Sequence, residues 1–398
     1  MGVCGIISEY NPFHNGHRFH IAETRRLLGR ETAVVCVMSG NFVQRGEPAV
    51  LEKYQRAKCA VLGGADLVLE LPLVSALSSA QGFARGGVSV LSALGGVTYL
   101  SFGTAAGDAA RLNALHTAAK TPAFQAALRE ELSRGCSYPK AAQTAADRLC
   151  PADSSLLADP NSLLGLEYLS ALEGTGIAPL VICRRGPDHD SPAAAGAFAA
   201  ASYLRGLLRE NRLSAAAPYV PADTMAVLKD AVTHGACPAS LENRGLLPLS
   251  FFRRLSRGEF ARTAFLSEGL ENRMWNAFYH ASSFAQGIAA AKTRRYPESR
   301  IRRTAMCAFL SITRETAALP LSFLRVLAMN ARGAALLRQA KTTCPLPIIT
   351  RSLAGRQLTG AAKTLWELDL LADDLFRLFL PQPAPGGLSY TQTPFYLE

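Results

Sequence analysis

Two histidines near the start of the chain have a spacing suited to phosphate chemistry. His14 and His17 stand in the segment His-Asn-Gly-His, directly after an apolar run from Val3 to Ile7. Imidazole N–H groups can donate hydrogen bonds to a phosphoryl group whose charge is being redistributed. Gly16, between them, has no Cβ and lets a nucleotide approach the backbone closely. The pattern suggests attack at the α-phosphate of a nucleotide.

A strand, a short loop and a helix N-terminus must position these residues. The run from Val3 to Ile7 is typical of a buried strand, Asn11-Pro12 of a turn, and Gly16 of the opening of an amphipathic helix. Unpaired N–H groups and the positive end of the helix dipole make such a junction a seat for phosphate. The alternative, that the histidines cap the helix or fill the core, is the commoner one for a bare His-x-Gly-His. The position directly after the first strand favours the nucleotide site.

Two blocks of sequence carry a resemblance to a known family. Residues 8–17 read Ser-Glu-Tyr-Asn-Pro-Phe-His-Asn-Gly-His, and residues 37–49 read Val-Met-Ser-Gly-Asn-Phe-Val-Gln-Arg-Gly-Glu-Pro-Ala. The strand, the histidine motif and the helix resemble the nucleotidyltransferase superfamily. Together the blocks resemble the tRNA(Met) cytidine acetate ligase family. The resemblance implies that ATP and acetate form acetyl-adenylate and pyrophosphate, with Mg²⁺ neutralising the leaving group. The acetyl group then passes to N4 of the wobble cytidine of elongator tRNA(Met), giving N4-acetylcytidine.

Strand and helix patterns alternate along the first 215 residues. Apolar runs at 32–38, 65–71, 97–102 and 178–183 predict further strands, with helical patterns between them. The alternation predicts an α/β fold with a Rossmann-like, doubly wound parallel sheet of the nucleotidyltransferase type, whose ligands bind at the carboxyl ends of the strands. An Ala-rich stretch at about 108–150 predicts a helical insertion. Residues 1–215 are therefore expected to form the ATP-binding catalytic domain.

Arginines follow the fifth strand and open the next helix. Arg184 and Arg185 leave the strand end, where they would stabilise phosphate charge as it develops. Ser202 and Arg205 stand in Ala-Ser-Tyr-Leu-Arg, which looks like a weakened form of the Ser-x-Thr-x-Ile-Arg element with which nucleotidyltransferases bind the β- and γ-phosphates. Ala200 stands where the element usually has a hydroxyl residue. This departure puts the hydroxyl contact with the phosphates in doubt, but not the contact made by the arginine.

Two further residues extend the expected site. Gly103 follows the fourth strand, where adenine or ribose could pack on its backbone, and a turn glycine is the alternative. The resemblance implies that Asn161 contacts ATP, and a helix cap is the alternative. The expected catalytic residues are His14, His17, Arg184 and Arg205. The expected ATP-binding residues are Ile7, Ser8, Glu9, Tyr10, Asn11, Pro12, Phe13, His14, Asn15, Gly16, His17, His20, Gly103, Asn161, Arg184, Arg185 and Ser202.

The second half of the chain has a different pattern and a stronger positive charge. Beyond residue 215 we find helical periodicity broken by Pro and Gly and no strong strand, which predicts a mainly α-helical domain over 216–398. The net charge of the chain is +11. Residues 181–310 hold 18 Lys and Arg against 10 Asp and Glu, whereas residues 1–150 hold 15 against 11. Such a field suits a polyanion larger than ATP, and tRNA fits it.

A basic cluster between residues 292 and 303 is the expected RNA contact. Its Thr-Arg-Arg-Tyr segment resembles Thr-Lys-Arg-Tyr of the ligase family, with Arg294 in place of the lysine. Basic side chains beside an aromatic ring can contact phosphates and stack on an unpaired base, and a solvated charged helix face is the alternative. Arg45, in a loop after the second strand, can reach a phosphate or a small carboxylate. The expected substrate and RNA residues are Arg45, Arg294, Arg295, Tyr296, Arg300, Arg302 and Arg303.

Composition narrows the remaining possibilities. Nine cysteines stand singly without a Cys-x-x-Cys pair, so we expect reduced thiols and no structural metal. The absence of a membrane-length apolar run predicts a cytoplasmic protein without a membrane partner. The oligomeric state and the general base for acetyl transfer stay open, with Glu9 and Asp188 as candidate bases. Alternative functions are a small-molecule adenylyltransferase and a non-catalytic RNA-binding protein on a nucleotide fold.

Overall fold

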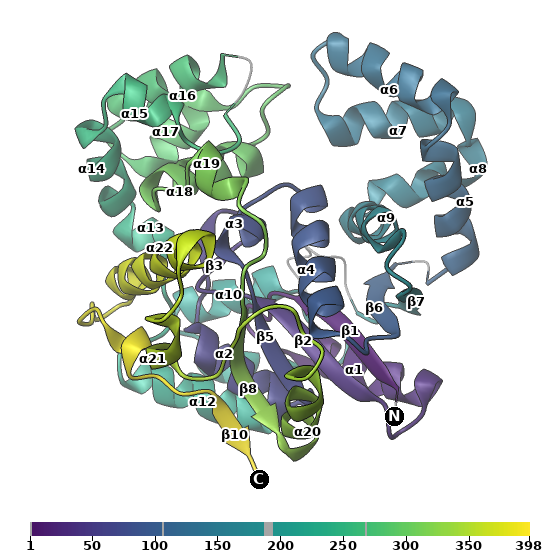
Figure 1. The fold of residues 1–398 in the computed structure, drawn as a ribbon. Coiled ribbons are helices and arrows are strands. Elements are labelled where there is room, and N and C mark those ends of the chain that lie inside the picture. Colours follow the sequence, from purple (N-terminus) through teal and green to yellow (C-terminus); the bar gives the residue numbers. More distant parts are fainter. Residues whose placement is uncertain (1, 106, 187–193, 267–268) are drawn as a thin grey trace.

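A mixed β-sheet forms the centre of the computed structural model, which describes residues 2–105, 107–186, 194–266 and 269–398 (Figure 1). Within these ranges eight strands share one sheet, in the order β10-β8-β5-β2-β1-β6-β7, with β9 beside β8. The strands are β1 (Val3–Ser8), β2 (Ala33–Ser39), β5 (Leu67–Leu71), β6 (Tyr99–Thr104), β7 (Ala178–Cys183), β8 (Leu324–Asn330), β9 (Ile348–Ile349) and β10 (Phe395–Leu397). A separate ribbon pairs β3 (Phe42–Val43) with β4 (Glu47–Pro48).

The part of the sheet built from the first half of the chain is parallel and wound in both directions from β1. β1 pairs with β2 on one side and β6 on the other, and β5 and β7 extend the sheet outward. Along β2, Val34, Cys36 and Met38 enter one core, whereas Val35 and Val37 enter the other. Because β2 is buried on both faces, its sequence is continuously apolar. The predicted α/β fold is confirmed.

Helices cover both faces of this sheet. α4 (Ala80–Leu94), α9 (Pro160–Leu172) and α20 (Ala331–Ala340) contribute to the core on one face. α1 (Asn15–Leu28), α2 (Lys53–Leu62) and α12 (Ala222–Thr233) contribute to the core on the other. The arrangement places the start of α1 directly beyond the carboxyl end of β1, as the motif requires.

The expectation that no strong strand follows residue 215 is wrong. β8 joins the sheet antiparallel to β5, and β9 and β10 pair with β8 in parallel. The sheet is therefore mixed and not wholly parallel. The apolar pattern of β8 is interrupted by Arg325, which is buried among carboxylates that only the folded chain brings to it, and β9 and β10 are too short to show a period. The predicted boundary between two domains near residue 215 stays a prediction. The strands β8, β9 and β10, which follow that boundary in the chain, belong to the central sheet.

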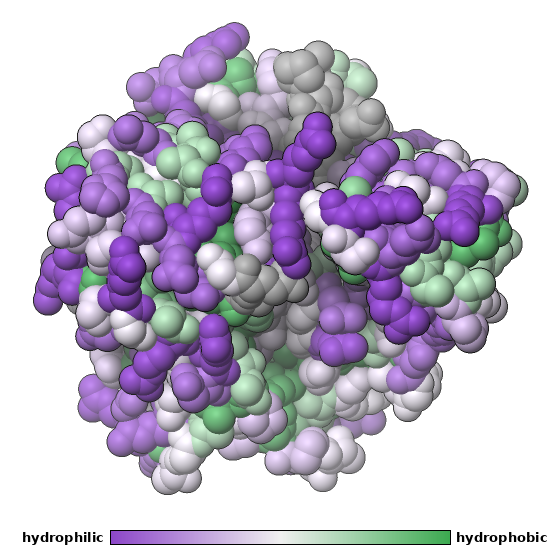
Figure 2. Space-filling model, turned by 90° about the horizontal axis from the view of Figure 1, so that it is seen from above, coloured by the Kyte–Doolittle hydropathy of each residue, from purple (hydrophilic) through white to green (hydrophobic). Residues whose placement is uncertain are grey.

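Two groups of helices stand above the sheet (Figure 1). One comprises α5 (Ala109–Ala119), α6 (Pro122–Ser133), α7 (Tyr138–Leu149) and the 3₁₀ turn Ser155–Ala158, which share a small core of their own, together with the short helix α8 (Pro151–Ser154). The other comprises α13 (Leu241–Arg244), α14 (Leu246–Arg254), α15 (Arg257–Ala261), α16 (Leu270–Tyr279), α17 (Phe284–Ala291) and α18 (Glu298–Phe309), which share a core with α22 (Gly360–Phe376). Seen from above, the surface is hollowed between the two groups (Figure 2).

Shorter elements connect these layers. They are α3 (Leu73–Ala76), α10 (Ala201–Arg209), α11 (Leu213–Ala216), α19 (Arg314–Ala317), α21 (Ser352–Gly355) and the 3₁₀ turns Ala217–Tyr219, Arg377–Phe379 and Leu388–Tyr390. Among the described residues, no helix combines the length and apolar character that a membrane crossing requires.

Candidate nucleotide site and the adjoining groove

A cavity of about 260 Å³ lies where β1, β6 and β7 end and α1 and α10 begin. Most of the expected ATP-binding residues line it, from segments as far apart as β1 and α10. The expected residues in its wall are Ile7, Ser8, Glu9, Tyr10, Asn11, His14, Gly16, His17, His20, Gly103, Asn161, Arg184 and Arg185, together with Arg45 and Arg205.

Four expected ATP residues lie outside the cavity wall. Phe13 is packed in the core beneath it and is 1% exposed, and Pro12 is also buried. Asn15 donates hydrogen bonds from Nδ2 to the carbonyl oxygens of Ala197 (2.9 Å) and Pro218 (3.0 Å). These residues shape the loop from beneath and behind. Ser202, the fourth, lines the neighbouring groove and not the cavity, and its contact with ATP stays a prediction.

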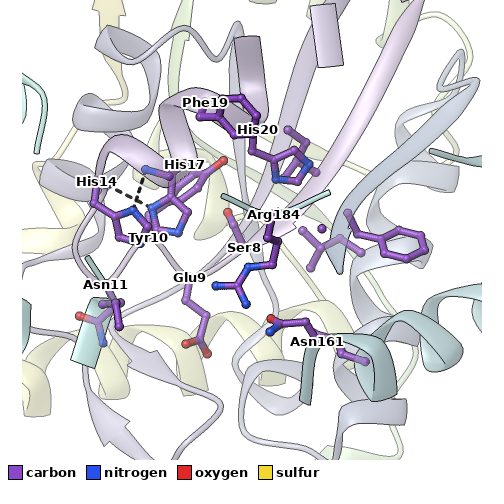
Figure 3. Close-up of a pocket in the computed structure, with 18 of the residues that line it drawn as sticks. Ser8, Glu9, Tyr10, Asn11, His14, His17, Phe19, His20, Asn161 and Arg184 are labelled. Carbon is purple, nitrogen blue, oxygen red and sulfur yellow. Dashed lines mark hydrogen bonds between the residues drawn. The ribbon is translucent and has the colours of Figure 1, made fainter. Parts of the chain in front are cut away.

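His14 and His17 cap α1 and line the cavity at the same time. The Nδ1 atom of His14 accepts the N–H of Gly16 (3.0 Å), and Nδ1 of His17 accepts the N–H of His14 (3.2 Å). An accepting Nδ1 carries no proton, so each neutral ring carries its proton on Nε2. The two rings lie against each other (Figure 3), and they stack with their centroids 3.7 Å apart. Capping and phosphate binding therefore do not exclude each other. The capping hydrogen bonds use Nδ1 of each ring, and a phosphate would be bound by the N–H group at Nε2.

The glycine of the motif has a second reason to lack a side chain. A Cβ on Gly16 would lie 2.8 Å from Cε1 of His14, closer than such contacts allow. Gly16 therefore makes room for the capping imidazole as well as for a ligand. The His17 ring is further fixed by Tyr10, whose ring meets it edge-on at 4.8 Å.

His20 lies deeper, one turn along α1. Its Nε2 is 2.8 Å from Oγ of Ser101, which in turn is 2.9 Å from Oγ1 of Thr24. Burial, with a smaller contribution from the charge of Arg184, lowers the pKa of His20 to about 4. His20 is therefore neutral at pH 7. It lines the cavity and forms a hydrogen bond with Ser101, but it adds no positive charge.

Arg184 is the arginine that reaches into the cavity from β7. Figure 3 shows its guanidinium between Glu9 and Asn161. Its stem lies against Gly103, where a Cβ would be 2.7 Å from Cγ of Arg184. Gly103 thus makes room for Arg184, a role that the strand-end position alone did not reveal. Arg185 instead places its guanidinium 4.7 Å from the ring centroid of Phe19, which also lines the cavity.

α10 presents its N-terminus to the cavity. Ala199, Ala200 and Ala201 line the wall, and Ala200 is the N-cap residue without a side-chain hydrogen bond. The backbone N–H groups of the first turn and the helix dipole can therefore serve an anion even though the usual hydroxyl is missing. Arg205, one turn on, is 8% exposed and donates from Nη1 to the carbonyl oxygen of Asn11 (3.1 Å).

Two glutamates face this basic site. Glu9 lines the cavity, and its Oε1 accepts the N–H of Gln44 (2.7 Å). Glu47, which sequence reasoning missed, is 7% exposed and lies 3.6 Å from Arg205, 3.5 Å from Arg209 and 3.9 Å from Arg302. Glu47 thus holds arginines from α10 and α18 together. Asp188, the other candidate base, lies outside the described residues.

Asn161 is not the helix cap that the alternative supposed. Asp159 is the N-cap of α9, and its carboxylate accepts the N–H groups of Asn161 and Ser162 (both 3.1 Å). The Asn161 side chain donates to Asp159 at 2.9 Å and lines the cavity. It therefore remains an ATP-binding candidate.

A buried ionic cluster supports the loops from below, and sequence reasoning missed it. Arg56 is fully buried and donates to the carbonyl oxygens of Glu9 (2.5 Å) and Gly40. Lys53 Nζ lies 2.8 Å from Glu70 and 2.7 Å from Asp373, which also accepts from Asn41 (2.9 Å). A lysine and an arginine three positions apart on an otherwise buried helix were the available signal.

A larger groove of about 1100 Å³ adjoins the cavity. Six residues line both spaces, namely Gln44, Arg45, Glu47, Asn161, Leu164 and Arg205. Of the expected RNA residues, Arg45, Arg295, Arg300, Arg302 and Arg303 line the groove. Arg294 is exposed outside its wall. The structure therefore brings most of the basic cluster to the mouth of the nucleotide site.

The expected stacking role of Tyr296 is wrong in this conformation. Its ring is 7% exposed and belongs to the core of the α13–α18 group. Arg300 and Arg295 cover it, at 5.2 Å and 5.8 Å from the ring centroid. A base cannot reach this ring, because the apolar core and the guanidinium groups already occupy its surroundings.

In the ranges that the structure describes, no three or more His, Cys, Asp or Glu side chains gather in a way that could hold a metal ion.

Comparisons with known proteins show which family the chain belongs to. Residues 1–388 match the family model described as HIGH Nucleotidyl Transferase. The chain is 34% identical to the tRNA(Met) cytidine acetate ligase of Acetivibrio thermocellus, with 98% of this chain and 99% of the relative covered. It is 36% identical to the protein of that name from Caldicellulosiruptor saccharolyticus, with 100% and 99% covered.

Solved structures extend the likeness to three dimensions. A crystal structure of Thermotoga maritima TmcAL bound with alpha-thio ATP superposes with a TM-score of 0.91, and an apo form with 0.93. Both are 32% identical to this chain, and each comparison covers 100% of both chains. The chain thus belongs to the tRNA(Met) cytidine acetate ligase family of HIGH nucleotidyltransferases.

Proposed function

We propose that the protein is an ATP-dependent ligase that acetylates N4 of the wobble cytidine of elongator tRNA(Met). The observation that carries the proposal is the continuity of two spaces. A cavity with the two capping histidines opens into a basic groove through six shared residues. The names of the relatives, tRNA(Met) cytidine acetate ligase, support the same substrates.

In the first step, an oxygen of acetate attacks the α-phosphorus of ATP, and the bond to the pyrophosphate oxygen breaks. His14 and His17 would donate from Nε2 to the phosphoryl oxygens as their charge grows, because their Nδ1 atoms are held by backbone N–H groups. Arg184 and the N-terminus of α10 would add positive potential on the other side of the cavity.

In the second step, the N4 amine of cytidine attacks the acetyl carbonyl carbon, and the bond to AMP breaks. The amine loses a proton and AMP keeps the bonding electrons. The cytidine must leave the stack of its loop to reach the cavity, which single-stranded RNA permits at low cost. We propose that residues 216–398, apart from the strands that they add to the sheet, bind the tRNA.

The residues also fit a Mg²⁺ ion that enters with ATP. Mg²⁺ in nucleotide sites is usually held by one or two carboxylates together with substrate phosphates. Glu9 supplies a carboxylate at the cavity wall. When bound, the ion would neutralise charge on the leaving pyrophosphate. We place the reaction in the cytoplasm, where ATP and tRNA occur together.

Two assays test the proposal. The purified protein would be incubated with ATP, labelled acetate and bulk bacterial tRNA, and the nucleosides analysed for acetylcytidine. Acetate-dependent exchange of pyrophosphate into ATP would report the first step alone. ATP-dependent label in acetylcytidine is expected. Release of pyrophosphate only with some other small acceptor would instead identify a small-molecule adenylyltransferase.

A further inference from the structure

The groove beside the nucleotide cavity has two walls that come from different parts of the chain. The first residues of α7 and the start of α9 form one wall, and residues 265–266 with the start of α18 form the other. Figure 2 shows the hollow between these two groups of helices. A pocket for one small molecule typically measures about 300–1,000 Å³. At about 1100 Å³, the groove has room for more than one nucleotide.

The groove carries an aromatic side chain on each wall. Tyr138, the first residue of α7, is 49% exposed, and Phe265, on the opposite wall, is 39% exposed. Both are among the thirteen large apolar or aromatic side chains of the described residues that are exposed. An exposed aromatic ring in a polar groove offers a flat face to a ligand.

Phe265 is held in an unusual backbone conformation. Its φ is +63°, in the left-handed region that bulky residues rarely adopt. The neighbouring backbone fixes it there, because the N–H of Ala264 donates to the carbonyl oxygen of Ile312 (2.9 Å) and Thr263 pairs with Thr313 in an antiparallel bridge. Such strain persists only where the surrounding structure imposes it, and it concentrates at binding sites.

The charge of the groove suits a nucleic acid backbone. Seven arginines line it against three glutamates, and Glu47 and Glu298 among these are paired with arginines. The arginines are Arg45, Arg205, Arg209, Arg295, Arg300, Arg302 and Arg303. Arginine guanidinium groups match phosphate oxygens, and aromatic rings between them match bases.

We propose that Tyr138 and Phe265 are stacking platforms for the unpaired bases that flank the acceptor cytidine. The inference rests on the proposed function, because the occupant is then a single-stranded tRNA loop. A cytidine that turns into the cavity leaves its neighbours without a stacking partner, and a ring on each side of the groove replaces that partner. The arginines hold the backbone of the same segment.

Ring-removal variants test the inference by steady-state kinetics on the full chain. Tyr138→Ala and Phe265→Ala are each expected to raise the KM for tRNA about tenfold, in line with the loss of one base–aromatic stack. Acetate-dependent pyrophosphate exchange, which needs no tRNA, should stay within about twofold of the wild type. Tyr138→Phe and Phe265→Tyr keep a ring and should keep the KM.

Tyr99→Ala is the matched control. Tyr99 is 37% exposed and lies at the opposite end of β6 from Gly103, so its loss should leave the KM for tRNA unchanged. Tyr138→Leu and Phe265→Leu separate stacking from general apolar contact, since leucine has no flat π face. They should behave like the alanine variants.

Three results would overturn the inference. An unchanged KM in both alanine variants would show that the rings do not contact the RNA. Full activity of the leucine variants would show that apolar contact suffices. Finally, a wild-type protein that performs the exchange but makes no acetylcytidine would refute the proposed function itself, and with it the RNA in the groove.

Discussion

At the scale of single residues, hydrogen bonds at the start of α1 decide which proton each histidine carries. His14 and His17 accept backbone N–H groups at Nδ1, so the proton of each neutral ring lies on Nε2. A motif that caps a helix and a motif that binds a nucleotide are here the same set of atoms. The loop behind them is fixed by Arg56, which holds the Glu9 and Gly40 carbonyl groups.

His17→Ala should reduce acetate-dependent pyrophosphate exchange by about 10²–10³-fold, the usual effect of removing one donor to a developing oxyanion. It should also lower the free energy of unfolding by about 1 kcal/mol, because one partner of the capping box is lost. Exchange kinetics and urea unfolding measure the two effects. Exchange at the wild-type rate in a folded variant would show that His17 has only the capping role.

His20 should make stability depend on pH below neutrality. Its pKa is lowered to about 4 in the folded chain, from an ordinary value near 6.5, because burial disfavours the charged ring. The unfolded chain therefore binds a proton first, and the free energy of unfolding falls as the pH drops from about 6.5 towards 4. The shift sets an upper limit of about 3 kcal/mol for this loss.

Urea unfolding at pH 7 and pH 4.5 would measure the effect in the wild type and in His20→Gln. The glutamine variant should lose less stability between the two pH values, since no imidazole remains to be protonated. His234→Gln serves as the control, because the His234 side chain is 71% exposed. An identical pH response in His20→Gln and the wild type would contradict the assignment.

At the scale of elements, the loop from β3 to β4 joins the nucleotide cavity to the basic helix α18. Gly46 has φ +72°, and a Cβ there would lie 2.5 Å from the backbone nitrogen of Arg303. Glu47 beside it lies near Arg205 of α10 and Arg302 of α18. The close approach of loop and helix thus sets the position of arginines that line the groove.

Gly46→Ala should therefore destabilise the protein more than loss of a positive-φ glycine alone. Gly29 also has positive φ, at +104°, but a Cβ there meets nothing within 4 Å. We expect Gly46→Ala to cost about 1–3 kcal/mol more than Gly29→Ala, the usual cost of overpacking. The difference in urea unfolding free energy measures this contact. Equal costs would mean that the loop and α18 separate easily.

At the scale of the whole molecule, charge and shape combine in one hollow. The α5–α8 group and the α13–α18 group stand on either side of it (Figures 1 and 2), and the groove there shares six lining residues with the nucleotide cavity. The buried cluster of Lys53, Glu70 and Asp373 ties the α22 end of the chain to the loops of the site. The second half of the chain is thus part of the sheet, the groove and the support of the cavity.

Arg300→Ala should weaken tRNA binding and reduce its salt dependence. Removing one phosphate contact from a single-stranded segment lowers the slope of log Kd against log salt by about 0.7. Fluorescence anisotropy with labelled tRNA would measure this slope between about 50 and 200 mM salt. Arg134→Ala, on the exposed surface of α6, is the control. An unchanged slope for Arg300→Ala would show that Arg300 of α18 makes no contact with an RNA phosphate.

The sequence by itself determined the parallel half of the sheet, the start of α1 and most of the cavity wall. These features depend on local patterns: an apolar run makes a strand, a helix start exposes N–H groups, and parallel strands end at one edge. His14, His17 and Arg184 could therefore be placed together from their positions after strands and at a helix start, whereas Asn161 was placed with them by the family resemblance.

Only the tertiary structure decided the rest, because it depends on contacts between residues far apart in the chain. β8 is a strand because carboxylates from β5 and α22 surround Arg325. Tyr296 looked like a stacking ring until the core of its helices covered it. Tyr138 and Phe265 share no local motif, and both line one groove because the fold brings the start of α7 and residues 265–266 to its two walls.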